Sequence, residues 1–328
     1  MSQIKFTSAD LVLKNLKIQD CSEEMKQYLL MYYVREVELK IAQEYPNGLM
    51  RTPVHLCVGH EAIPVGLSEH LISEDKVLSN HRSHGHYLAK GGSLISLFGE
   101  LLGRQIGCSK GRGGSQHLID LSVNFIASAP ILGGTVPIAA GIAFSHKLQG
   151  LGAIVVAYLG DAVLEEGVLF ETISFASLHS IPILFVVENN RLSVHTYLDK
   201  RQPKRRLKDI GSAFGLRAEE FDGNNVVEVS RAGKSHINYV RKERKPSILF
   251  FETFRRLEHV GPDEDFNLNF RDPVEVKNWL LRDPLELAAQ KLKKSESQAM
   301  SFNNLKNQIN SYIELSWQSA LASEMAQQ

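Results

Sequence analysis

Short, continuous apolar runs form the clearest pattern along the chain. The runs from Ala153 to Leu159 and from Ile181 to Val187 are rich in β-branched residues, and each is closed by glycine or polar residues. Such runs are typical of parallel strands that are buried on both faces of a sheet. Residues 165–179, between the two runs, carry apolar residues at roughly helical spacing. The pattern predicts a strand, a helix and a second strand, and hence an α/β fold with a mainly parallel sheet flanked by helices on both faces.

Weaker patterns on either side of this unit predict the rest of the fold. Ser22 can cap a helix that runs to about Tyr45, and residues 247–252 form another apolar run that predicts a buried strand. The other expected elements are a strand at 77–82 and helices within 128–143 and at 209–214, 226–241, 283–292 and 305–325. We expect one α/β domain over residues 21–290, with extensions over 1–20 and 291–328 that are helical.

Polar residues follow both central strands. Asp161 comes directly after Gly160, and Asn190 follows the second strand. Because parallel strands joined by a crossover helix point the same way, Asp161 and Asn190 should emerge at one edge of the sheet. A carboxylate oxygen, an amide oxygen and the main-chain carbonyl of Leu192 would supply three ligands to Mg²⁺, and a diphosphate and water could complete the octahedron. The alternative is an ordinary strand-end acid and an asparagine turn.

Two more stretches carry candidate chemistry. The expected strand at 77–82 leads into His81, Arg82 and His84, which suit a site at a strand end better than a core, although histidines bonded in a buried turn are the alternative. Residues 103–117 are rich in glycine with interleaved basic residues, a weak signal for phosphate binding that lacks the spacing of a P-loop.

Composition narrows the class of protein and of partner. The 328 residues include 37 basic and 37 acidic side chains, and this balance argues against a nucleic-acid or acidic-membrane partner. The 3 cysteines are widely spaced without a CxxC pair, so neither a disulfide framework nor a zinc site is indicated. No basic, apolar leader and no apolar run of about 18 residues is visible, so we expect a cytoplasmic protein that does not span a membrane.

Several segments together resemble one enzyme family. GDAVLEEG and IPILFVVENN resemble the GDG…NN thiamin diphosphate motif of the α subunits of 2-oxo acid dehydrogenase E1 components. The GHEA, HRSHG and CSKGRGGSQH segments resemble the GQEA, YRxHG and CxKGxGGSMH segments of that family, and the resemblance covers roughly residues 20–290. It implies a thiamin diphosphate-binding fold, with thiamin diphosphate and Mg²⁺ as cofactors.

The same resemblance implies roles for individual residues. The implied metal ligands are Asp161, Asn190 and Leu192, and the implied cofactor-binding residues are His81, Arg82, Leu132, Gly160, Asp161, Ala162, Val163, Asn190, Leu192 and His259. His84, near the reacting carbonyl, and His259, in the loop after the strand at 247–252, are the implied catalytic residues. An exposed loop histidine without a task is the alternative for His259.

The sequence departs from the family pattern at several positions. Ala162 replaces the second glycine of the motif, and its methyl group could crowd the diphosphate. His60 replaces a glutamine, and His81 replaces a tyrosine. Val260 replaces the serine that kinases modify in mitochondrial relatives, so that form of regulation is not expected.

The resemblance also implies a reaction and partners. Because the catalytic glutamate of such enzymes belongs to a separate β subunit, we expect an α2β2 heterotetramer that decarboxylates a 2-oxo acid and passes the acyl group to a lipoyl-bearing E2 acyltransferase. The histidine at position 84 favours a pyruvate-like substrate. Acetoin cleavage, carbon–carbon bond formation on a modified sugar, and a non-catalytic subunit remain as alternatives. The basic run at 199–208 is either a solvated loop or a docking surface for an acidic partner.

Overall fold

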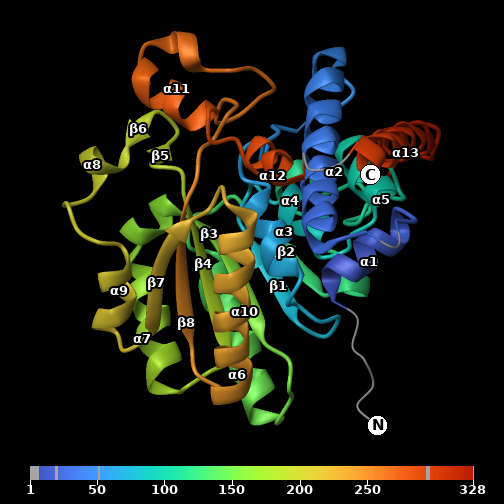
Figure 1. Cartoon of the computed structure of the whole chain (residues 1–328). Coiled ribbons are helices and arrows are strands. Elements are labelled where there is room, and N and C mark those ends of the chain that lie inside the picture. The colour runs from blue at the N-terminus through green and yellow to red at the C-terminus, as the bar shows by residue number, and fades with distance from the viewer. Residues whose placement is uncertain (1–6, 19–20, 51, 293–295, 328) are drawn as a thin grey trace.

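A six-stranded parallel sheet organises the protein. The computed structural model describes residues 7–18, 21–50, 52–292 and 296–327, and the strands run in the order β2-β1-β3-β4-β8-β7 (Figure 1). Their bounds are β1 Lys76–Ser79, β2 Phe125–Ser128, β3 Val155–Gly160, β4 Ile183–Asn189, β7 Arg217–Asp222 and β8 Ser247–Glu252, and a small antiparallel pair is formed by β5 Leu192–Ser193 and β6 Thr196–Tyr197. The central pair, β3 and β4, aligns Gly160 with Glu188, so both strands end at the same edge.

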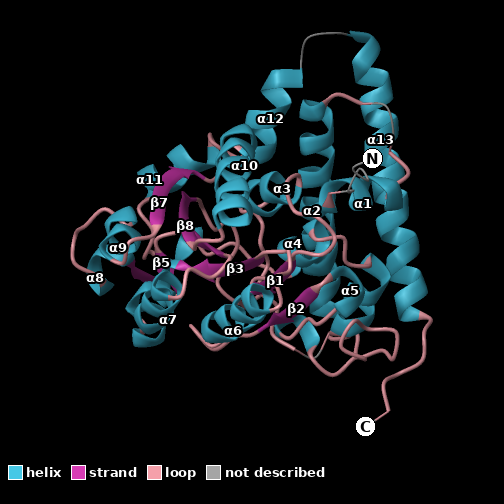
Figure 2. Ribbon diagram, turned by 90° about the horizontal axis from the view of Figure 1, so that it is seen from below, coloured by secondary structure: helices cyan, strands magenta, loops and turns pink. Residues whose placement is uncertain are grey.

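Helices cover both faces of this sheet. The bounds are α1 Ser8–Asn15, α2 Glu23–Glu44, α3 Ala62–Ser68, α4 His84–Ala89, α5 Leu94–Leu101, α6 Thr135–Leu148, α7 Gly167–Leu178, α8 Leu198–Arg201, α9 Lys208–Ala213, α10 Val226–Glu243, α11 Pro273–Leu280, α12 Pro284–Leu292 and α13 Glu296–Leu321. In Figure 2, α6 and α7 lie on one side of the sheet, and α10, α3 and α2 lie on the other.

Alternate residues of each central strand supply the two cores. Val155 and Ala157 pack into the core shared with α6 and α7, whereas Val156 and Tyr158 pack into the core shared with α2, α3 and α10. A strand buried on both faces has apolar residues at every position, which explains the continuous runs in the sequence. The predicted α/β fold class is confirmed.

Several predicted boundaries are close to the observed ones, and two need correction. The helix capped by Ser22 is α2, and the Ser22 hydroxyl accepts the Met25 N–H at 3.3 Å. The helix expected from residue 165 begins at Gly167, because residues 161–165 form a 3₁₀ turn. The strand expected at 77–82 ends at Ser79, which leaves His81 and Arg82 in the following loop.

Both edge strands of the sheet were missed by the pattern of apolar residues. β7 carries two glutamates and an arginine and has no fully buried residue, and β2 is only four residues long. An edge strand is covered less completely than a central one, so its sequence lacks the continuous apolar run.

The C-terminal helices pack against the body of the protein. α13 contacts α5 and α2, and its Trp317 is buried in the larger core. The proposed division at residues 20/21 and 290/291 stays a prediction, and residues 1–6, 19–20, 51, 293–295 and 328 lie outside the described residues. Within the described part of the chain, no helix has the length and apolar character needed to cross a membrane.

Candidate active site

A cavity of about 250 Å³ lies at the carboxyl ends of β3 and β4. It is lined by most of the predicted site residues, namely His81, Arg82, Leu132, Gly160, Asp161, Ala162, Asn190, Leu192 and His259, together with His60, Asn80, Pro130, Glu188, Ser193 and Val194. The segments that carry them are far apart in sequence, and the parallel sheet brings them to one edge. Two predicted residues, Val163 and His84, are not part of this lining.

The backbone at the end of β3 has free space beside it. A Cβ atom built on Gly160 would meet no atom within 4 Å, so there is space beside the backbone at this position. Asp161 and Ala162 follow in the 3₁₀ turn, which is right-handed, and Ala162 does not have a positive φ. The alanine therefore fits this turn without the left-handed conformation that would require glycine.

The turn after β4 is held by its own asparagines. Asn190 Oδ1 accepts the Leu192 N–H at 3.0 Å, and Asn189 Oδ1 accepts the Arg191 N–H at 3.1 Å. These bonds fix the backbone that carries Asn190 and Leu192 along the cavity wall. An amide oxygen can accept a second partner, so Asn190 retains a lone pair for a cation.

The Arg201 side chain holds the predicted metal ligand Asp161, and the sequence analysis missed this contact. The Arg201 guanidinium donates to the carboxylates of Asp161 and Glu165, and its Nε donates to the Thr196 carbonyl at 3.1 Å. Burial raises the pKa of Asp161 to about 6, although Arg201 acts in the opposite direction. Arg201 lies inside the basic run at 199–208, for which a solvated loop and a docking surface were the two alternatives, and its side chain is only 9% exposed.

The loop that carries His259 is anchored to the segment that carries His55. The Gly261 N–H donates to the Val54 carbonyl at 2.9 Å. The Arg82 guanidinium donates to the Leu56 carbonyl, and also to the His259 carbonyl at 3.3 Å. The histidine-bearing loop is thereby tied, at His259 and Gly261, to the segments that carry Arg82 and Val54.

Three histidines meet at this junction. The ring centroids of His55 and His81 are 4.5 Å apart, those of His55 and His259 are 5.0 Å apart, and those of His81 and His259 are 5.5 Å apart. Burial lowers the pKa of each ring, to about 2 for His55, about 4 for His81 and about 3 for His259, and the Arg82 cation adds to the effect. The three imidazoles are therefore neutral at pH 7. No local sequence signal marked His55.

The structure places His84 away from the cavity. Its ring is fully buried, with Nδ1 2.9 Å from Glu38 Oε1 and Nε2 2.9 Å from Ser115 Oγ. Both ring nitrogens are thus occupied by neighbours in the protein. His84 is not among the residues that line the cavity, and its role on the substrate stays a prediction.

A buried carboxylate and two histidines lie beside the predicted metal ligands. Burial alone would raise the pKa of Glu188, but His86 and His60 outweigh it and hold that pKa at about 2. His86 Nε2 lies 3.1 Å from Glu188 Oε1, whereas His60 Nδ1 lies 3.6 Å from Glu188 Oε2. Neither ring nitrogen of His60 has a hydrogen-bond partner among the described residues, so this buried side chain faces the cavity unsatisfied.

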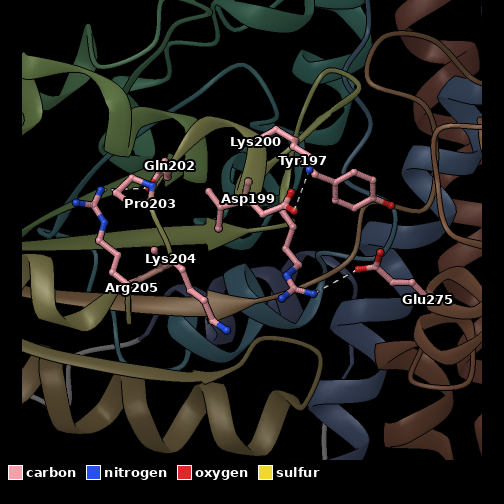
Figure 3. A pocket seen from close by; sticks show the side chains of 11 residues that line it. Tyr197, Asp199, Lys200, Gln202, Pro203, Lys204, Arg205 and Glu275 are labelled. Carbon is pink, nitrogen blue, oxygen red and sulfur yellow. Dashed lines mark hydrogen bonds and ion pairs between the residues drawn. The ribbon is translucent and has the colours of Figure 1, made fainter.

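A second, basic cavity of about 680 Å³ lies next to the loop that carries Arg201 (Figure 3). Its cationic side chains are Arg191, Lys200, Lys204 and Arg205, and Arg191 Nη1 lies 3.5 Å from Glu275 Oε1. Lys200, Lys204 and Arg205 are exposed. The alternatives of a solvated loop and a docking surface both stay open for these three residues.

Comparison with known proteins identifies the family. The model of the "Dehydrogenase E1 component" family matches residues 30–327. The chain is 35% identical over 269 residues to the pyruvate dehydrogenase E1 component subunit alpha of Zymomonas mobilis, covering 81% of this chain and 75% of that protein. It is 32% identical over 274 residues to the protein of the same name from Rickettsia felis, covering 83% of each. The chain therefore belongs to the dehydrogenase E1 component family, whose members are oxidoreductases that use thiamin diphosphate with a divalent metal ion.

Proposed function

We propose that this chain is the α subunit of an E1 enzyme that decarboxylates a pyruvate-like 2-oxo acid and passes the acyl group to lipoamide. The single observation that carries the proposal is that Asp161, Asn190 and Leu192 line one cavity at the carboxyl edge of the sheet. Their carboxylate, amide and carbonyl oxygens are the donors that Mg²⁺ prefers. The relatives named as pyruvate dehydrogenase subunits support the choice of substrate.

The residues present fit a diphosphate and its metal ion. The open space beside Gly160 gives a backbone cradle that a larger residue would fill, and the unsatisfied His60 ring offers a donor or acceptor to a bound group. We assign Arg82, Ala162 and Val163 to the diphosphate end and Leu132 and His81 to the neighbouring wall. Val163 is buried behind the turn, so its contribution would come from the backbone.

The chemistry divides between cofactor and protein. Thiamin diphosphate, when bound, supplies the electron sink for loss of CO₂ from the 2-oxo acid. The protein orients the bound groups and excludes water from the cavity. His259, neutral at pH 7 and anchored through the Arg82 guanidinium, would accept or donate a proton at the substrate carbonyl oxygen.

The proposed assembly is an α2β2 heterotetramer with a separately encoded β subunit, located in the cytoplasm. Among the described residues, Glu188 is the glutamate that lines the cavity, and its Oε1 lies 3.1 Å from His86 Nε2. Following the family resemblance, we assign the acid that works beside the cofactor's pyrimidine to the β subunit. An E2 acyltransferase with a lipoyl group would take the acyl group.

The first test is calorimetric titration of thiamin diphosphate with Mg²⁺ into the chain co-purified with its β partner. We expect saturable binding that Asp161→Asn abolishes and that Asp199→Asn, an exposed acid on the nearby loop, leaves intact. Product formation from pyruvate with and without a lipoyl acceptor then decides between dehydrogenase chemistry and acetoin cleavage or sugar carboligation.

One observation favours a second candidate function. The Arg201 guanidinium donates a hydrogen bond to the Asp161 carboxylate, which is a proposed ligand of the metal ion. If a well-folded complex fails to bind thiamin diphosphate and Mg²⁺, a non-catalytic subunit that keeps Arg201 in this place becomes the better conclusion.

A further inference from the structure

Several buried histidines of this protein have a hydrogen-bond partner at both ring nitrogens. His84 contacts Glu38 and Ser115 through its two nitrogens. His86 and His236 likewise have two partners each, at distances between 2.6 and 3.1 Å. These buried rings are satisfied by the protein, as expected for imidazoles with a structural role.

The rings of His81 and His259 are different. Within the described part of the chain neither ring makes a hydrogen bond, and His55 makes one, between Nδ1 and Gln116 Nε2 at 3.1 Å. One ligand nitrogen of each of the three rings lies within 4.8 Å of the others. His81 and His259 are only partly buried, so their ring nitrogens, which have no protein partner, are open to an added ligand.

Hydrogen bonds between the segments that carry the three histidines hold these segments together, so the three rings stay close to one another. The Gly261 N–H bond to the Val54 carbonyl joins the His259 loop to the His55 segment. The Arg82 guanidinium, next to His81 in the chain, bonds to carbonyls of both segments. Three loops are thereby clamped around one point beside the cavity.

We propose that His55, His81 and His259 form a second metal site, which binds a divalent transition metal of the Zn²⁺ class. Three imidazoles with a position left open are the ligand set of catalytic zinc sites, and nitrogen donors favour Zn²⁺, Co²⁺ or Ni²⁺ over Mg²⁺. Bonds of about 2.0 to 2.1 Å would require the nitrogens to close to about 3.3 Å by rotation of the rings.

The surroundings are compatible with such an ion. The neutral state of the three rings leaves their lone pairs available at pH 7. If the Gln116 amide turns its oxygen to the His55 ring, Nδ1 donates to it and Nε2 is free to bind the metal, which is the usual outer contact of a ligating histidine. Arg82 opposes the charge of the cation, and an anionic ligand in the open position would offset it.

The open position is reached from the cavity, because His81 and His259 line it. If the proposed function holds, the carboxylate of the 2-oxo acid would be the oxygen donor in the open position. Binding of the metal itself does not depend on that function, and the His259 nitrogen that binds the metal would not exchange a proton while the metal is bound. The oxygen ligands at Asp161 and the nitrogen ligands at His81 would thus select different metals in one cavity.

The test uses Co²⁺ as probe with the untagged full-length chain, followed by its visible absorption and by calorimetry. We expect one equivalent to bind with the spectrum of a nitrogen-rich tetrahedral or five-coordinate ion. His81→Tyr, which keeps a ring and restores the usual residue of the family, should weaken binding at least about tenfold. His259→Asn serves as the second ligand variant if the tyrosine variant is misfolded by circular dichroism.

Two controls separate this site from other sources of binding. His195→Gln removes an exposed histidine outside the cluster and should leave the Co²⁺ titration unchanged. Asp161→Asn should abolish binding of thiamin diphosphate with Mg²⁺ and leave Co²⁺ binding intact, so failure of the proposed function and failure of this site give different results. Absence of saturable Co²⁺ binding, or binding that His81→Tyr and His259→Asn leave intact, would overturn the proposal.

Discussion

Two groups of candidate metal ligands lie at the same cavity, and they differ in chemistry and in state. The oxygen group, Asp161, Asn190 and the Leu192 carbonyl, comes from two neighbouring strand ends, and its carboxylate is already held by the Arg201 cation. The histidine group, His55, His81 and His259, comes from three segments that are far apart in sequence. The rings of His81 and His259 have no hydrogen-bond partner among the described residues, although they contact each other and His55.

The difference shows how one cavity can separate two kinds of ion. Charged oxygen donors attract any cation, including an arginine of the same chain, so their availability depends on what competes for them. Neutral imidazoles do not attract a guanidinium in this way, and they bind only ions that accept nitrogen lone pairs. Single substitutions test whether the two groups of ligands differ in this way.

The largest effect is expected from Asp161→Asn. The substitution keeps the shape and removes the only formal charge of the oxygen group, so the affinity for thiamin diphosphate with Mg²⁺ should fall by about 100-fold or more. Calorimetry of the complex with its β partner measures the loss. Affinity within about threefold of the unsubstituted protein would show that the metal binds elsewhere, and the contrast between the two groups would fail.

A smaller effect of opposite sign is expected from Arg201→Gln. The guanidinium must leave Asp161 before a cation binds there, so removing it should tighten binding of Mg²⁺ with thiamin diphosphate by about tenfold, or about 1.4 kcal/mol. Lys200→Gln, one position earlier and 74% exposed, is the matched control and should change nothing. A weaker affinity in the Arg201 variant would mean that Arg201 supports the bound state instead of competing with it.

The pH dependence of stability should depend on His236, a buried histidine whose two ring nitrogens both have hydrogen-bond partners, unlike those of His81 and His259. Burial lowers the pKa of His236 to about 4, with Arg217 acting in the same direction and Glu219 opposing it. A histidine whose pKa is lower in the folded state than in the unfolded state stabilises the fold above about pH 6.5, and this contribution is lost as the pH falls towards 4. His236 therefore adds a slope of up to about 1.4 kcal/mol per pH unit in that window.

The measurement is the free energy of unfolding in urea at several pH values between 4.5 and 7. His236→Gln should flatten the pH dependence while lowering the stability at pH 7, because Ser247 and Glu219 lose a partner. An unchanged slope would show that Glu219, which faces the same ring, carries the pH dependence instead.

The sequence was most informative where the structure is most regular. β3 and β4 were found because strands buried on both faces have apolar residues at every position, and Asp161 and Asn190 could be placed together because such strands end at one edge. The fold class was predicted from these apolar runs, whereas the family and its thiamin diphosphate cofactor were implied by the resemblance of several motifs, and all three are confirmed.

The sequence was least informative about contacts made by side chains across long loops. In the sequence, Arg201 is one cation among several in a basic run, and its contact with Asp161 joins residues 40 positions apart. The contact of His55 with His81 and His259 joins three segments whose spacing carries no signal. His84 was placed near the substrate by resemblance, and the sequence did not show that both of its ring nitrogens have protein partners, Glu38 and Ser115.

The smallest effect is expected from Ala162→Gly, which restores the residue usual in the family motif. Because Ala162 lies in a right-handed turn without a positive φ, glycine gains no backbone conformation that alanine lacks. Added freedom of the unfolded chain should lower stability by about 0.5 to 1 kcal/mol, and the affinity for thiamin diphosphate should change by less than about threefold, which corresponds to under 1 kcal/mol. An affinity gain above about tenfold in calorimetry would show that the methyl group crowds the diphosphate. In that case Arg201 would not be the main obstacle to filling the oxygen group, and the contrast with the histidine group would rest on space as well as on charge.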